Sequence, residues 1–188
     1  MISHQHKCIF VHQLRCGGTS VIRAFGLESP DDPDWHYANH GTLGPELYAK
    51  PAGYFTFSTV RNPWDKLVSA WLHSGWVHCE EVRHLPLRTL LTNLPRNGSA
   101  YRHVARLQRD ILYDASGDLA VDFLMRFETL DADWRTVCER IGKPYSPLPH
   151  HNKNKQRRPY QEYFTGPVDR DLFRRHFQRD LDTFGYEF

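Results

Sequence analysis

The sequence predicts a three-layer α/β domain in which a central parallel sheet is flanked by helices. Short apolar runs alternate along the chain with segments whose apolar residues recur every three to four positions, and this alternation is typical of strands joined by crossover helices. The strand-like runs are continuously apolar, as expected of parallel strands buried on both faces. With 188 residues, the chain is predicted to form one domain over residues 1–188.

The first half of the chain contains two predicted strands, each followed by a helix. Residues 8–12 form the first apolar run, and a helix is expected from 19 to 25 with Gly26 as its end. Residues 54–60 are rich in aromatic and β-branched side chains and predict the second strand. Asn62 and Pro63 then begin a helix as cap and first position. The predicted apolar face of this helix consists of Trp64, Leu67, Val68, Trp71 and Leu72.

The remaining elements are predicted from periodicity and from helix-starting and helix-ending residues. Helices are expected at 42–50, over much of 83–113, and from a cap at Asp131 to Ile141. A third strand is expected at 119–127. A final amphipathic helix is expected at 167–184. Its inward residues are predicted to be Val168, Leu172, Phe173, Phe177, Leu181 and Phe184.

The composition excludes several classes of protein. A net charge of +2 is too small to indicate general nucleic-acid binding, and no apolar run is long enough to span a bilayer. The apolar run near the N-terminus is too short for a signal-peptide core. The four cysteines are scattered without a CxxC pair, which favours reduced thiols and a cytoplasmic protein. The spacing of His73, His78 and Cys79 matches no zinc motif, so no metal is expected.

The segment Arg15-Cys-Gly-Gly-Thr-Ser20 is a candidate anion site between the first strand and its helix. Gly17 and Gly18 would let the backbone approach a ligand without a Cβ. The amides of Gly18, Thr19 and Ser20, the two hydroxyls and the Arg15 guanidinium would supply donors. The alternative is an ordinary strand-to-helix turn. A Walker A loop is disfavoured, because no Lys follows Gly18.

Two further basic features come later in the chain. Arg61 stands directly after the second buried strand, where it needs an anionic partner or solvent, and Ser69 lies two turns into the next helix. A shared phosphate contact is the favoured interpretation, although Ser69 also suits helix packing. Residues 150–158 contain a cluster of cations, which is either a solvated charge run or an anion-binding loop. The cations of this loop are Lys153, Lys155, Arg157 and Arg158.

These segments together resemble a family of sulfotransferases that use 3′-phosphoadenosine 5′-phosphosulfate (PAPS), the heparan sulfate 2-O-sulfotransferases and their bacterial relatives. The resemblance spans five segments in sequence order and therefore nearly the whole chain. It implies the P-loop-like sulfotransferase fold. The five segments are Ile9–Ser20, Phe57–Trp71, Val121–Leu130, Leu148–Lys153 and Asp180–Phe188.

The resemblance implies transfer of a sulfuryl group from PAPS to a hydroxyl of a carbohydrate or small alcohol, without a metal. Arg15 stands where the family carries a catalytic Lys, and Leu14 where it carries Pro. The first segment would bind the phosphosulfate, and Arg61 with Ser69 the 3′-phosphate. His40 is the expected general base, with His36 in reserve. Within the basic loop, the expected nucleotide contacts are Asn152, Lys155 and Arg157.

Two alternative functions stay open at the level of sequence. The first is a catalytically impaired module that binds the product 3′-phosphoadenosine 5′-phosphate (PAP). It stays open because the Arg at the catalytic position cannot lose a proton at ordinary pH and is bulkier than Lys. A P-loop-type small-molecule kinase is the other, against which the missing Walker Lys counts. Glu128 is expected to be a structural residue rather than a base.

Overall fold

The computed structural model describes residues 1–26, 51–72, 80–94, 101, 104–149 and 157–188. The chain divides into two compact units, each made of two separate stretches of sequence. Unit 1 comprises Met1–Arg61 and Ile111–Lys153, and unit 2 comprises Asn62–Asp110 and Asn154–Phe188. Each unit has a hydrophobic core of its own.

Unit 1 is built on a four-stranded mixed sheet. Its strands are β1 (Ile2–Ser3), β2 (Cys8–Val11), β3 (Phe55–Val60) and β4 (Phe123–Arg126), in the spatial order β1-β2-β3-β4. β2, β3 and β4 run parallel, as predicted, whereas β1 pairs antiparallel with β2. The expectation of an entirely parallel sheet was therefore wrong, because a two-residue strand is too short to show any hydrophobic period.

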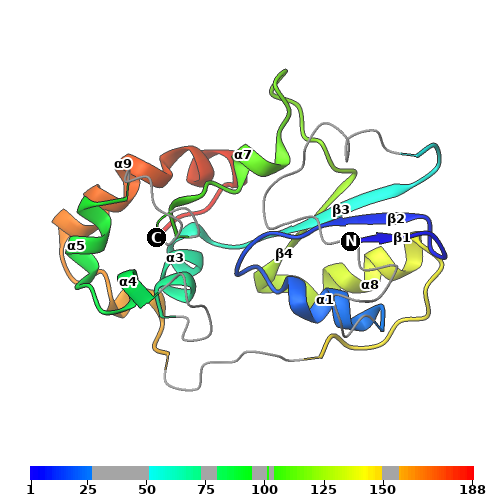
Figure 1. Ribbon diagram of the computed structural model, residues 1–188, viewed down its shortest axis with the longest axis horizontal. Coiled ribbons are helices and arrows are strands. Elements are labelled where there is room, and N and C mark those ends of the chain that lie inside the picture. Colours follow the sequence, from blue (N-terminus) through cyan, green and yellow to red (C-terminus); the bar gives the residue numbers. More distant parts are fainter. Residues whose placement is uncertain (27–50, 73–79, 95–100, 102–103, 150–156) are drawn as a thin grey trace. The chain divides into compact units, whose positions relative to one another are not determined.

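Helices α1 (Gly18–Ala24) and α8 (Leu130–Arg140) lie on the same face of this sheet (Figure 1). Alternate strand residues such as Phe10 and Phe57 point toward them, since successive side chains of a strand face opposite sides. The buried residues of this core are Met1, Cys8, Phe10, Val21, Ile22, Phe57, Met125, Trp134, Val137, Cys138, Ile141 and Leu148. The prediction of a strand–helix–strand arrangement with an α/β core is confirmed.

The ends of the unit 1 elements agree with the sequence only in part. Gly26, at φ 77°, donates its N–H to the carbonyl of Arg23 at 2.9 Å and ends α1 as predicted. The predicted strand at 119–127 is confirmed only for β4. Asp131 is not the cap of α8, because the 3₁₀ turn η2 (Phe127–Thr129) intervenes and Thr129 takes the cap position. The Asp131 carboxylate instead accepts the Tyr145 hydroxyl at 2.7 Å.

Unit 2 is helical in its described residues. It contains α3 (Pro63–Trp71), α4 (Glu80–Arg83), α5 (Leu87–Thr92), the 3₁₀ turn η3 (Tyr160–Glu162) and α9 (Pro167–Phe184). α7 (Arg109–Leu112) lies where the chain passes from unit 2 to unit 1. These helices satisfy part of the expectation for 83–113. The predicted helix at 42–50 lies outside the described residues.

The core of unit 2 forms where α3 and α5 pack on α9. The Trp64 ring stacks on Phe173 with centroids 3.7 Å apart, and Phe164 meets Trp64 edge-on. Asn62 and Pro63 begin α3 as predicted, and Asn62 Oδ1 accepts the N–H of Trp64 at 3.0 Å. The aromatic contacts join two stretches that lie about a hundred residues apart in the sequence.

The bounds of α9 match the prediction, with Pro167 at its start and Gly185 at φ 65° after its end. Its inward face is partly different. Val168 is 51 % exposed and was wrongly placed inside, whereas Asp169 is 6 % exposed. The Asp169 carboxylate accepts a hydrogen bond from Nε of Arg88 at 2.7 Å, and this ion pair compensates for the burial of Asp169. Phe173, Phe177, Leu181 and Phe184 are buried as predicted, and Leu172 is partly buried.

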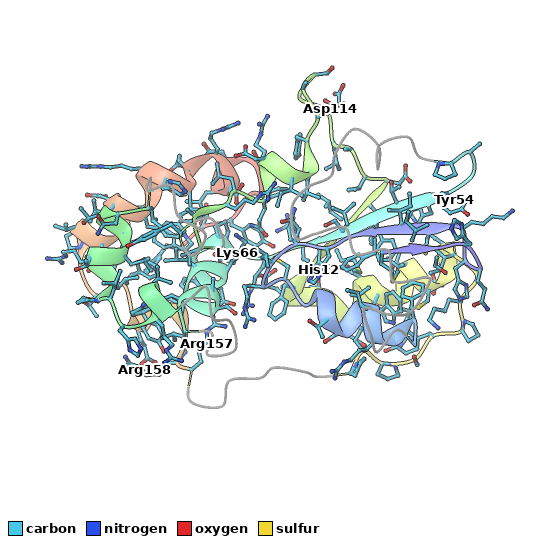
Figure 2. All side chains as sticks on the ribbon, in the orientation of Figure 1. His12, Tyr54, Lys66, Asp114, Arg157 and Arg158 are labelled. Carbon is cyan, nitrogen blue, oxygen red and sulfur yellow. The ribbon has the colours of Figure 1, made fainter. Side chains whose placement is uncertain are left out.

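A buried polar cluster holds the segment before α7 within unit 2. Asp180 of α9 accepts the backbone N–H groups of Gln108 at 2.8 Å and Arg109 at 2.9 Å. Lys66 of α3, labelled in Figure 2, donates a hydrogen bond from its Nζ to the carbonyl of Arg106 at 2.8 Å. Burial raises the pKa of the Asp180 carboxyl, while Lys66 and the donated hydrogen bonds oppose that rise.

No helix among the described residues combines the length and the apolar character needed to cross a membrane.

Candidate functional site

The residues of the first predicted anion site lie in the β2–α1 loop, residues 12–17, and in the first turn of α1. β2 and β3 are adjacent parallel strands in which Val11 pairs with Ser58. Oγ of Ser58 donates to the carbonyl of Val11 at 2.6 Å and ties the two strands together just before they end. The loop therefore begins at a rigid point beside the carboxyl end of β3.

Two residues of the loop have backbone φ angles in the left-handed region. Gly17 has φ 82° and Arg15 has φ 61°. Glycine adopts this region at little cost, but a residue with a Cβ enters it only against steric repulsion. Arg15 is thus a strained position within the predicted site, and its side chain is half-buried.

Gly17 and Gly18 are both required by packing within unit 1. A Cβ on Gly17 would lie 2.8 Å from Cδ2 of Leu130 and 3.3 Å from the Phe127 ring. A Cβ on Gly18 would lie 2.0 Å from Cδ2 of His12, whose ring covers this position. Internal packing accounts for the two glycines, and the prediction that they also admit a ligand stays a prediction.

Arg61 joins the same loop from the end of β3. Its side chain is buried, and Nη1 donates to the backbone carbonyl of Arg15 at 2.7 Å. Its guanidinium carbon lies 3.8 Å from the centroid of the Phe127 ring, a cation–π contact. The structure thus brings together Arg15 and Arg61, which are 46 residues apart in sequence.

Phe127 is a site residue that the sequence did not indicate. It begins η2 directly after β4, the strand next to β3. The available signal was its place at the end of the third predicted strand, within Arg126-Phe-Glu128. An aromatic residue there is easily taken for a core residue, and only the folded chain shows that its ring contacts Arg61.

The other predicted contacts belong to unit 2 or lie outside the described residues. Ser69 is buried in α3 of unit 2, and its predicted share in a phosphate contact with Arg61 stays a prediction. Arg157, labelled in Figure 2, is also in unit 2, where it forms an ion pair with the Asp65 carboxylate and donates a hydrogen bond to the Asp65 carbonyl at 3.2 Å. Asn152, Lys155, His36 and His40 lie outside the described residues.

The described part of the β2–α1 loop and its surroundings carries positive charge and hydroxyl groups. The Arg15 and Arg61 side chains carry two permanent positive charges, and the partly exposed Thr19 and Ser20 carry hydroxyl groups. Among the described residues, no group of three or more His, Cys, Asp or Glu side chains is placed to hold a metal ion. His73, His78 and Cys79 fall outside these residues.

Comparison with known proteins gave no match to a family model, a curated protein or a solved structure.

Proposed function

We propose that the protein is a PAPS-dependent sulfotransferase that acts on a hydroxyl of a carbohydrate or a small alcohol. The observation that carries the proposal is the convergence of the two basic segments on one loop, where the Arg61 guanidinium contacts the Arg15 carbonyl at 2.7 Å. The sequence places these segments at the ends of two strands, and β2 and β3 are indeed adjacent and parallel. In open α/β sheets, ligands bind outside the carboxyl ends of the strands.

The donor set also suits the proposed substrate. PAPS carries anionic groups at both its 5′ and 3′ positions, and guanidinium groups form strong charge-assisted hydrogen bonds to phosphate and sulfate oxygens. In the proposal, Arg15 with the residues from Gly17 to Ser20 holds the transferring sulfuryl group. Arg61 contributes to the 3′-phosphate contact, and Ser69, Asn152, Lys155 and Arg157 are its further proposed partners.

The proposed reaction is an in-line displacement at sulfur. His40 takes the proton of the acceptor hydroxyl, and the acceptor oxygen forms a bond to sulfur. The bond between sulfur and the bridging oxygen breaks, so that PAP leaves with the bonding electron pair. Arg15 stabilises the negative charge that develops on the leaving phosphate. Positioning and electrostatics account for the catalysis, as in phosphoryl transfer.

A non-catalytic PAP-binding module is a second candidate, favoured by one observation. The residue at the expected catalytic position is an Arg with a strained backbone, at φ 61°. Such a module would bind PAP through the same residues and would fail to transfer the sulfuryl group of PAPS to any acceptor.

A thermal-shift comparison of PAP, ATP with Mg²⁺, and AMP tests the proposal. A ligand at about 100 times its dissociation constant adds roughly 2.7 kcal/mol to the free energy of unfolding, so PAP should raise the melting temperature clearly. Arg140→Ala, which changes an exposed arginine of α8, serves as a control that retains the shift. A shift with ATP and Mg²⁺ but none with PAP would favour a kinase. Turnover of PAPS then separates the enzyme from the binding module.

A further inference from the structure

Arg15 has a backbone conformation that the rest of unit 1 must maintain. Its φ of 61° lies in the left-handed region, and it is one of two described residues other than glycine with a positive φ. Strained conformations of this kind persist only where the surrounding structure fixes them, and they cluster at functional sites. The contacts of Arg15 therefore indicate which residues control the geometry of the loop.

Arg61 supplies one of these contacts from a rigid support. It follows β3 directly, and β3 is paired with β2 on one side and with β4 on the other. Its Nη1 donates to the Arg15 carbonyl at 2.7 Å. A hydrogen bond to this carbonyl fixes the orientation of the peptide group between Arg15 and Cys16. The conformation of Arg15 is thereby connected to the end of the central strand.

Phe127 acts through Arg61 and connects it with the next part of the loop. The centroid of its ring lies 3.8 Å from the guanidinium carbon of Arg61. The same ring lies 3.3 Å from the position that a Cβ on Gly17 would occupy. The Phe127 ring thus packs both on the Arg61 guanidinium, which holds Arg15, and against Gly17, the left-handed glycine two residues after Arg15.

We infer that Arg61 and Phe127 form a positioning pair, which holds the peptide group of Arg15 and so sets the direction in which the Arg15 side chain leaves the loop. The inference rests on the proposed function, in which Arg15 is the cation that acts on the leaving phosphate. Arg61 then also acts near the sulfuryl group of PAPS, in addition to its proposed contact with the 3′-phosphate. The same inference makes Phe127 a positioning residue of the site.

Cys16 offers a direct readout of this geometry. It is fully buried within the loop, and its Sγ donates to the Leu14 carbonyl at 3.2 Å. Cys8 and Cys138, in β2 and α8, are buried in the core of the same unit. Alkylation by iodoacetamide requires an exposed thiol. The rate at Cys16 therefore reports opening of the loop, and the rates at the other two report unfolding of unit 1.

The experiment compares Arg61→Lys and Phe127→Leu with the wild type. Arg61→Lys keeps the charge and loses the planar group, whereas Phe127→Leu keeps an apolar side chain and loses the ring. Arg140→Lys is the matched control, because Arg140 also lies over aromatic rings, 4.9 Å from the Phe123 centroid. Alkylation of each cysteine is followed by mass spectrometry of its peptide. Affinity for PAP and single-turnover transfer from PAPS are measured on the same proteins.

The expected result is faster alkylation of Cys16 in both variants. The increase should be roughly tenfold or more in Arg61→Lys, as for loss of a hydrogen bond to a charged group. In Phe127→Leu it should be roughly twofold to thirtyfold, as for loss of a cation–π contact. The rates at Cys8 and Cys138 stay at the wild-type level, and Arg140→Lys changes none of the three. In Phe127→Leu, the transfer rate falls more than the affinity for PAP. Unchanged alkylation of Cys16 in both variants overturns the inference. Equal acceleration at all three cysteines in both variants also overturns it, because the pair would then support unit 1 as a whole.

The proposed function fails separately. If the wild type neither binds PAP nor consumes PAPS, the function is wrong, and the alkylation rates still decide whether Arg61 and Phe127 hold the loop.

Discussion

The imidazole of His12 covers Gly18 so closely that a Cβ built on the glycine would lie 2.0 Å from Cδ2 of the ring. His12 is the first residue after β2, and Gly18 is the first residue of α1. The contact closes the β2–α1 loop on itself, because it joins the two ends of the connection. It also explains why a small residue is needed at the start of α1.

Gly18→Ala is expected to destabilise unit 1 by about 1–3 kcal/mol, the usual cost of overpacking a filled space. The same substitution in a His12→Ala background should cost nothing, because the obstructing ring is gone and Ala favours a helix over Gly by roughly 0.5–1 kcal/mol. Urea unfolding of the two single variants and the double variant measures both free energies.

Gly17→Ala is the matched control for this cycle. Its backbone has φ 82° and its Cβ would meet Leu130, so removing His12 should leave its cost unchanged. Rescue of Gly17→Ala by His12→Ala, or no rescue of Gly18→Ala, would contradict the assigned contacts.

Arg15 is expected to act mainly on the transition state. Arg15→Ala should lower the rate of transfer from PAPS more than it lowers the affinity for PAP, because the contact strengthens as charge develops on the leaving phosphate. Arg15→Lys restores the residue of the resembled family and should retain or raise activity. Single-turnover transfer from labelled PAPS, with water as the minimal acceptor, measures the rates. A wild-type rate in Arg15→Ala would remove Arg15 from the proposed catalytic role.

Arg61 is expected to distinguish two donors that differ only in the 3′-phosphate. Arg61→Ala should weaken the binding of both PAPS and adenosine 5′-phosphosulfate, because the loop loses its contact with the guanidinium. The loss should be larger for PAPS by roughly 1.5–3 kcal/mol, the typical value of a hydrogen bond to a charged group. Calorimetric titration gives both affinities. Equal losses for the two ligands would place the 3′-phosphate away from Arg61.

Asp180 is expected to make stability depend on pH in a definite direction. Burial raises the pKa of its carboxyl above the ordinary value of 3.8. The folded state therefore binds the proton more tightly than the unfolded state. The contribution of Asp180 to the free energy of unfolding is fully present at pH values below 3.8 and is lost as the pH rises through the folded pKa. In Asp180→Asn the group no longer titrates.

The measurement is urea unfolding of the wild type and Asp180→Asn at several pH values above 3.8, the ordinary pKa of the carboxyl. The free energy of unfolding of the wild type, less that of the variant, should decrease as the pH increases. A difference that grows with pH would mean that the hydrogen bonds from Gln108 and Arg109, together with Lys66, outweigh the desolvation of Asp180.

The sequence predicted helix ends better than helix faces. α9 begins at Pro167 and ends before Gly185, because both residues restrict the backbone locally. Whether Val168 or Asp169 faces inward depends on a rotation of one residue, and the partner of the buried Asp169 is Arg88, 81 residues away along the chain. Likewise, Asp131 had the chemistry of a cap, but the extra 3₁₀ turn that moved the helix start left no local signal.

For the candidate site, the sequence indicated Arg15 and Arg61 separately but not the contact between them. Basic residues after buried strands can be recognised one by one. The bond from Arg61 to the Arg15 carbonyl depends on the pairing of β2 with β3 and on the left-handed turn at Arg15. Phe127 acquires its role only through the pairing of β3 with β4. Such contacts depend on tertiary structure that no short segment encodes.

Because each unit is made of two separate stretches, the residues of unit 1 are all synthesised before those of unit 2 are complete. A ribosome completes both parts of unit 1 once residue 153 has been made, whereas unit 2 still lacks Asn154–Phe188. Until α9 emerges, Trp64 of α3 and Leu90 of α5 lack the helix that carries Phe173 and Phe177. The apolar faces of α3 and α5 that pack on α9 in the folded protein therefore have to wait for the last helix of the chain.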